Sequence, residues 1–131
     1  MKLITKKKDY VRLKIPPYRM DVFVSFIEDP IPKLPFSGDF IEELENDGGY
    51  QGICYQLEDT RGTDICYLRL LKKYKDTIVM HECIHAAEFI LSSRGITISP
   101  DNHEALTYLT EFLFHLIKVG VYNKKGDPYY D

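Results

Sequence analysis

The sequence predicts an α+β fold in which a small, mostly antiparallel sheet packs against two long antiparallel helices. Segments rich in β-branched and aromatic residues fill the first half of the chain, and two long apolar segments with helix boundary signals fill most of the second. The length suits one hydrophobic core. We therefore expect one domain over 1–131, strand-rich at 1–75 and helical at 76–120, with a polar tail at 121–131.

The strand-rich half contains two pairs of predicted strands. Pro16 and Pro17 separate "YVRLKI" from "DVFVSFI", while "YQGICYQL" and "DICYLRLL" flank the polar loop "EDTRGT", as in an antiparallel hairpin. Between the two pairs, "SGDFIEELEND" predicts a short amphipathic helix that is capped by Ser37 or Asp39 and ended by two glycines.

Two long helices are predicted in the second half. The first begins near Asp76, a candidate N-cap, and runs to about Ser93, with Gly95 as a left-handed terminator. The second has Ser99 as a candidate N-cap and Pro100 at its first helical position. Since the first helix is apolar nearly all round, we expect it to be the central helix of the fold.

Composition narrows the functional class. A hydrophobic content of 44% with 28% charged residues is typical of a globular protein, and charges interrupt each apolar run before the ~20 residues that a membrane span needs. A net charge of -3 argues against nucleic-acid binding. No export signal is visible at the N-terminus, so we expect a cytoplasmic protein whose basic run at 6–8 is a solvated end.

The three cysteines indicate a reducing compartment. An odd number of cysteines without a close-spaced pair is a poor disulfide framework. Cys54 and Cys66 fall inside the strands of the predicted hairpin, where we expect small buried thiols.

The stretch "VMHECIHAAEFIL" contains the pattern HExxH, formed by His81, Glu82 and His85. On a helix the two imidazoles lie only about 40° apart and roughly 6 Å along the axis, so both can reach one zinc ion. Glu82 is rotated by about 100° from His81, which places its carboxylate beside a water on the metal. We expect a Zn2+ site with Glu82 as the general base; the alternative is a core helix with hydrogen-bonded histidines.

A catalytic zinc has three protein ligands and one open position. Glu104, near the start of the second predicted helix, is the best candidate for the third ligand if the two helices are antiparallel. His103 projects about 100° away from Glu104, and Asp101 could serve instead if the helix begins later than expected.

Three further polar residues lie on the same two helical stripes. Glu88 follows the two histidines, and we expect it to orient an imidazole. Tyr108 and His115 follow Glu104 and could donate a hydrogen bond to a developing oxyanion, although a polar pair along the helix interface is the favoured interpretation.

With HExxH followed by Glu104 nineteen residues after its second histidine, the C-terminal half resembles zincin-like metallopeptidases of the glutamate-ligand class. The chain is more closely similar to a group of short, largely uncharacterised proteins encoded by bacterial viruses, through "DVFVSFI", "SGDFIEELEND", "ICYQLEDTRGTDICYLRLL", "HECIH", "SSRGI" and "DNHEALTYL". The resemblance covers about residues 20–118 and implies a minimal zincin-like domain.

Position by position, this resemblance implies His81, His85 and Glu104 as metal ligands and Glu82 as the catalytic base. His103 departs from the pattern, because that group has an acidic residue there, and the departure changes the charge near the metal. The resemblance implies no particular substrate.

The predicted function is that of a zinc-dependent metallopeptidase acting on a peptide or protein substrate, in the host cytoplasm if the chain is encoded by a virus. A strand edge could hold an extended substrate. The alternative is a metal-stabilised binding protein without turnover, such as a viral factor acting on a host component, because 131 residues leave little room for a second lobe beside a cleft.

Overall fold

The computed structural model describes residues 2–34 and 50–124 of the chain. In chain order the elements are β1 (Ile4–Lys6), β2 (Val11–Ile15), β3 (Met20–Phe26), β4 (Gly52–Glu58), β5 (Asp64–Leu70), α2 (Asp76–Ser93) and α3 (His103–Gly120). The short helix predicted between the strand pairs lies outside the described residues, as do residues 125–131 of the predicted tail.

The sheet has the order β1-β2-β3-β5-β4 and is mixed. Its outer pairings β1–β2, β2–β3 and β4–β5 are antiparallel, whereas β3 and β5 run parallel, with Val24 opposite Leu68. The α+β class is confirmed, but the sheet is mixed because the chain passes from β3 to the edge strand β4 before the hairpin returns as β5.

The hairpin of β4 and β5 is confirmed, and its loop is organised by one carboxylate. Asp59 accepts hydrogen bonds from the backbone N–H groups of Arg61 at 2.8 Å and Thr63 at 2.9 Å. These two hydrogen bonds lower the pKa of Asp59, and the bond from Thr63 has the larger effect. Gly62 has a φ of +80°, which a residue without Cβ adopts freely.

The basic N-terminal segment forms a strand that the sequence analysis missed. β1 pairs with β2, with Thr5 opposite Arg12, while the run at 6–8 is exposed, as expected. The start of the predicted polar tail is also more structured than expected, since Tyr122 packs against the core and donates a hydrogen bond to the carbonyl of Leu71 at 2.6 Å.

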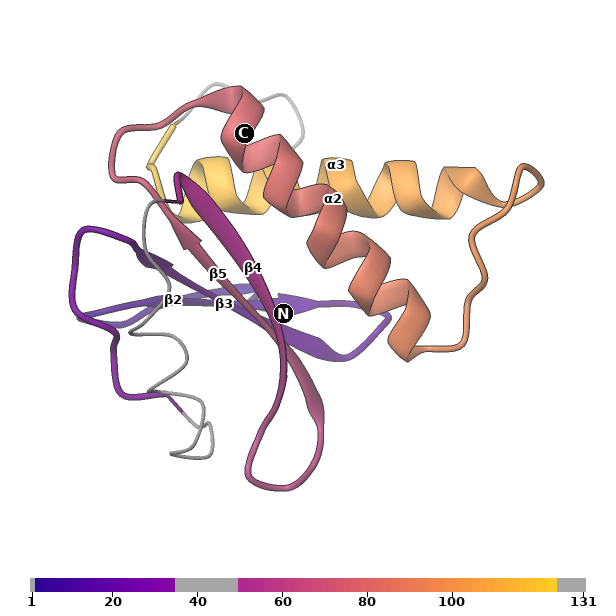
Figure 1. The fold of residues 1–131 in the computed structure, drawn as a ribbon, viewed down its shortest axis with the longest axis horizontal. Helices are drawn as coiled ribbons and strands as arrows, with labels where there is room; N and C mark the ends of the chain where they lie inside the picture. The colour runs from indigo at the N-terminus through magenta and orange to yellow at the C-terminus, as the bar shows by residue number, and fades with distance from the viewer. Residues whose placement is uncertain (1, 35–49, 125–131) are drawn as a thin grey trace.

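Both helices lie on the same side of the sheet, where α2 crosses α3 (Figure 1). Alternating strand residues pack beneath them, and the main core comprises Leu13, Ile15, Met20, Val22, Val24, Cys66, Leu68, Leu70, Val79, Cys83, Ala86, Ala87, Ile90, Leu91, Leu109, Leu113, Leu116 and Ile117. The opposite face of the sheet has a smaller core of Phe23, Leu57, Ile65 and Tyr67, against which Ile31 and Leu34 pack.

A buried cation organises that opposite face. Arg69 is 6% exposed and donates from Nη1 to the hydroxyls of Tyr67 and Ser25, and from Nη2 to the carbonyls of Ile27 and Asp29. Because a buried guanidinium is costly without acceptors, these bonds fasten the segment after β3 to β5.

The α2 boundaries are confirmed, but one capping role is wrong. Asp76 is the first helical residue rather than the cap, which is Lys75, and the carboxylate of Asp76 accepts a hydrogen bond from the Tyr74 hydroxyl. Gly95 terminates the helix as predicted, with a φ of +73°. The N–H of Ile96 bonds to the carbonyl of Leu91 at 2.9 Å, which completes a Schellman-type end.

The helix α3 begins at His103, later than predicted. Asn102 Oδ1 accepts hydrogen bonds from Ser99 N at 2.6 Å and Ser99 Oγ at 3.1 Å, and Asn102 N donates to the Ser99 carbonyl. Side-chain bonds of this kind compete with helical ones. Residues Ser99 to Asn102 therefore form a turn, and Pro100 is not the first helical residue.

The helix α2 is less central than its apolar sequence predicts. One face packs into the core, while Met80 and Ile84 on the other are 36% and 39% exposed. Within 2–34 and 50–124, neither helix has the length and apolar character needed to cross a membrane.

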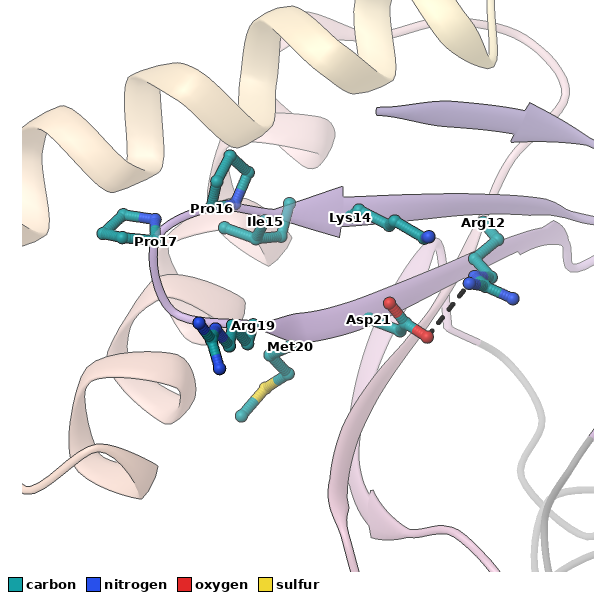
Figure 2. Close-up of a pocket in the computed structure, with 8 residues that line it drawn as sticks. All are labelled: Arg12, Lys14, Ile15, Pro16, Pro17, Arg19, Met20 and Asp21. Atoms are coloured by element: carbon teal, nitrogen blue, oxygen red, sulfur yellow. Dashed lines mark ion pairs between the residues drawn. The ribbon is translucent and has the colours of Figure 1, made fainter. Parts of the chain in front are cut away.

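A pocket of about 620 Å³ lies at the turn between β2 and β3, where the Pro16–Pro17 peptide bond is cis (Figure 2). Arg12 on its wall pairs with Asp21 at 3.3 Å. Arg94, after α2, donates to the carbonyl of Tyr18 at 2.6 Å and so ties the α2–α3 loop to this turn.

Candidate metal centre

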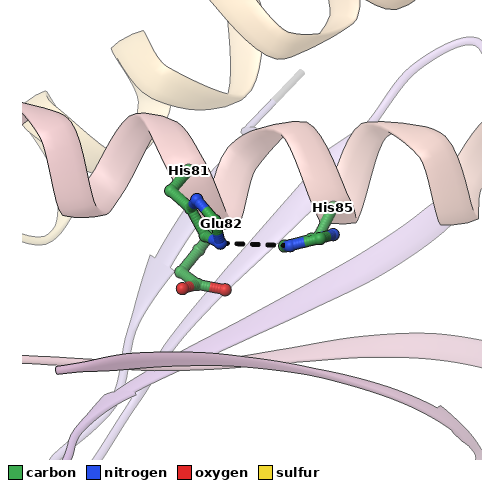
Figure 3. A group of neighbouring side chains, drawn as sticks. All are labelled: His81, Glu82 and His85. Carbon is green, nitrogen blue, oxygen red and sulfur yellow. Dashed lines mark hydrogen bonds between the residues drawn. The ribbon is translucent and has the colours of Figure 1, made fainter. Parts of the chain in front are cut away.

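The helix α2 brings His81, Glu82 and His85 together on one side. Their ligand atoms all lie within 4.8 Å of one another, and the three side chains extend from α2 toward the strands (Figure 3). The two histidines are exposed and Glu82 is buried. Helical spacing of three and four residues accounts for this grouping, as the sequence analysis predicted.

The two imidazole rings lie within hydrogen-bonding distance of each other. His81 Nε2 and His85 Nε2 are 3.2 Å apart, and their rings are inclined at 74°. This separation is short enough for both nitrogens to bind one metal ion such as zinc, and it also lets one imidazole donate a hydrogen bond to the other.

Glu82 lies between these histidines and the sheet. Its side chain is buried against β4, with 6% of the residue exposed. Burial raises the pKa of Glu82, and the nearby charges of His81 and His85 oppose the rise. A carboxylate with a raised pKa beside two imidazoles is a candidate for a general base.

Gly52 at the start of β4 allows this close packing. A Cβ at position 52 would stand 2.9 Å from Glu82 Oε2 and 3.0 Å from Ile78 Cγ2, closer than ordinary van der Waals contact. The sequence analysis did not single out this residue. The sequence offers only a weak indication of this role, because a glycine at the start of a predicted strand can mark a close approach of two backbones.

Two surface pockets meet at His81. One has a mixed polar and apolar lining, a volume of about 260 Å³ and wall residues Gln51, Gly52, Thr77, Ile78, His81 and Glu82. The other is more apolar, has a volume of about 510 Å³ and is lined by Asp76, Thr77, Met80, His81, Ile84 and Phe114. A molecule at His81 therefore has adjoining space in both pockets.

The candidate third ligand, Glu104, does not belong to this group. It is exposed in the first turn of α3, and the group formed by the described residues contains only the α2 side chains. The later start of α3 changes where Glu104 stands relative to α2. Asp101 and His103 are also exposed, and His103 Nδ1 contacts the Pro100 carbonyl at 2.8 Å. Ligation by Glu104 stays a prediction.

The remaining predicted site residues lie apart from the group. Glu88 is exposed and lines a pocket with the α2–α3 loop, and Tyr108 is 64% exposed. His115 Nε2 lies 3.9 Å from Glu111 Oε1, one turn away on the same helix, and the polar pair along the helix interface stays a prediction. Orientation of an imidazole by Glu88 and oxyanion binding by Tyr108 or His115 stay predictions.

The fold and this group of side chains together describe an α+β domain with a candidate two-histidine metal centre. The chain matches no known family model, and no curated protein or solved structure shows significant similarity to it. The function is therefore argued from the chemistry of the site itself.

Proposed function

We propose that this protein is a zinc-dependent hydrolase that cleaves peptide bonds. The observation that carries the proposal is the 3.2 Å separation of His81 Nε2 and His85 Nε2, with the Glu82 carboxylate beside them. Zinc, when bound, polarises a carbonyl and lowers the pKa of a water molecule.

The residues of the chain supply the other functions. His81 and His85 hold the metal, and Glu82 accepts a proton from the attacking water and passes it to the leaving amine. Burial supports this role, because a carboxylate whose pKa is raised takes a proton more readily than an ordinary glutamate.

The strand β4 offers a binding surface for an extended peptide. It is the last strand in the sheet order and pairs only with β5 among the described strands. Gly52, at its start, packs against Glu82. A substrate that adds to this edge would place its backbone next to the proposed base, and backbone hydrogen bonds would supply affinity without a second lobe.

The first experiment measures zinc content and peptide cleavage together. Wild-type protein should bind one zinc ion per chain and cleave an unstructured protein, with products identified by mass spectrometry. His81→Ala and His85→Ala should lose both properties, whereas the matched control His103→Ala should keep both, since His103 lies outside the group. Absence of zinc binding in the wild type would refute the proposal.

A second function has support from one observation. Glu82 belongs to the same group of possible ligand atoms as the two histidines. If Glu82 is itself the third ligand, no base remains at the site, and the chain is a metal-stabilised binding protein without turnover.

Glu82→Gln and Glu104→Gln distinguish the two functions. As a base, Glu82 is dispensable for zinc affinity, so Glu82→Gln should keep the metal and lose cleavage. As a ligand, Glu82 is needed for affinity, so the same variant should bind zinc weakly. A weaker zinc affinity in Glu104→Gln alone would support the predicted third ligand and leave Glu82 as the base.

A further inference from the structure

The three cysteines of the chain gather between the sheet and α2. Cys54 lies on β4, Cys66 on β5 and Cys83 on α2 beside Glu82. All three are free thiols; Cys66 and Cys83 are buried and Cys54 is half-buried. Cys54 Sγ and Cys66 Sγ are 3.5 Å apart, in direct contact.

The strand register explains this contact. Cys54 stands opposite Leu68, and Cys66 stands opposite Gln56, so the two cysteines are diagonal neighbours on adjacent antiparallel strands. Diagonal neighbours have Cα atoms roughly 7–8 Å apart, whereas disulfides usually span about 4.4–6.8 Å. The sulfurs must approach by about 1.5 Å to reach the S–S bond length of about 2.0 Å, and at this Cα separation the backbones of the two strands must also shift relative to each other.

We propose that Cys54 and Cys66 form a modification site, at which hydrogen peroxide produces a reversible disulfide between β4 and β5. In the first step peroxide oxidises the Cys54 thiol to a sulfenic acid and is reduced to water. In the second, the Cys66 sulfur attacks the Cys54 sulfur, the S–S bond forms, and the sulfenic hydroxyl leaves with the Cys66 proton as a second water. One peroxide thus oxidises two thiols and yields two waters.

The solvent exposure and hydrogen bonding of the two thiols indicate which of them reacts with peroxide first. Cys54 is half-buried and lies two residues along β4 from Gly52, which lines the smaller pocket at His81. Cys66 is fully buried, and its hydrogen bond with Cys54, together with burial, raises the pKa of the Cys66 thiol. Peroxide therefore meets Cys54 first, and Cys66 acts as the resolving thiol.

We expect the Cys54–Cys66 disulfide to be easily reduced, because the two cysteines are diagonal neighbours on their strands. A disulfide formed at a Cα separation above the usual range stores strain, and strained disulfides are reduced more easily than structural ones. This agrees with a chain in a reducing compartment, where the bond forms only during oxidation. The bond would fix β4 to β5 two residues along β4 from Gly52, which packs against Glu82.

The test counts thiols in the full-length, metal-free protein. After treatment with hydrogen peroxide, acid quenching and denaturation, titratable thiols should fall from three to one, and peptide mapping without reductant should show Cys54 joined to Cys66. A mild dithiol reductant should restore all three. Cys83→Ser should still lose two thiols, since Cys83 is not part of the pair.

Two variants test the assigned order. Cys66→Ala, checked for folding by circular dichroism, should accumulate a sulfenic acid at Cys54 that a sulfenic-acid-specific reagent captures. Cys54→Ala should leave Cys66 reduced under the same treatment. A bond to Cys83, disulfide-linked dimers, or oxidation of Cys54 beyond the sulfenic acid in the wild type without a Cys54–Cys66 bond would each overturn the proposal.

Discussion

The replacement of Gly52 by alanine tests how β4 positions the proposed base. The new Cβ would stand 2.9 Å from Glu82 Oε2, at least about 0.5 Å inside ordinary contact distance, and 3.0 Å from Ile78 Cγ2. Glu82 must therefore move. Overpacking of this kind typically costs about 1–3 kcal/mol of unfolding free energy. A shift of about half an ångström in a catalytic group can lower kcat by about tenfold.

The assay combines urea unfolding, zinc titration and peptide cleavage. Gly52→Ala should be less stable and cleave more slowly, yet keep its zinc affinity, because the mutation does not touch His81 or His85. The matched control is the same mutation in a Glu82→Ala background, where most of the clash is gone and the alanine should cost about 1 kcal/mol less. Equal costs in the two backgrounds would refute the assigned contact.

Three further predictions concern stability. Burial raises the pKa of Glu82, so the contribution of this side chain to stability is present below about pH 4.5 and is lost as pH rises through the raised pKa. The metal-free Glu82→Gln variant should therefore have a higher melting temperature than wild type, and the difference should grow from pH 4 to pH 7. A difference in melting temperature that stays constant over this range would contradict the prediction. Gly95→Ala should destabilise the protein by about 1–2 kcal/mol in urea unfolding, because φ is +73° and no atom of the described residues would offer the new Cβ a compensating contact within 4 Å. No change in stability would show that α2 does not end in a left-handed residue. Arg69→Met removes the hydrogen bonds to Tyr67 and to the carbonyl of Asp29 and should cost about 2 kcal/mol or more, whereas an unchanged unfolding midpoint would show that this cation does not fasten the segment after β3.

Local patterns predicted much of the fold. The strands "VRLKI" and "MDVFVSF", the β4–β5 hairpin and the Gly95 terminator all depend on residues that are close in sequence. The parallel pairing of β3 with β5 joins segments separated by a long connection, and no local pattern indicates which strands become neighbours. The start of α3 was missed because the Asn102 side chain bonds back to Ser99 and competes with the first helical turn.

The candidate site, like the fold, could be predicted where it depends on residues close in sequence and not where it depends on tertiary packing. His81, Glu82 and His85 lie within one helix, so their spacing alone brings them together. The position of Glu104 depends on the path of the α2–α3 loop and on the helix start, which the sequence does not specify. The approach of Gly52 to Glu82 depends on the packing of β4 against α2 and becomes visible only in three dimensions.

X-ray absorption at the zinc edge measures the coordination of zinc in the loaded wild-type protein and so tests the proposed metal centre. We expect one zinc per chain with two imidazole nitrogens at about 2.0–2.1 Å, oxygen ligands that include one exchangeable water, and loss of both imidazole signals in the His81→Ala, His85→Ala double variant. A zinc closed by four protein ligands would contradict catalysis. A spectrum unchanged by the double variant would contradict the site itself.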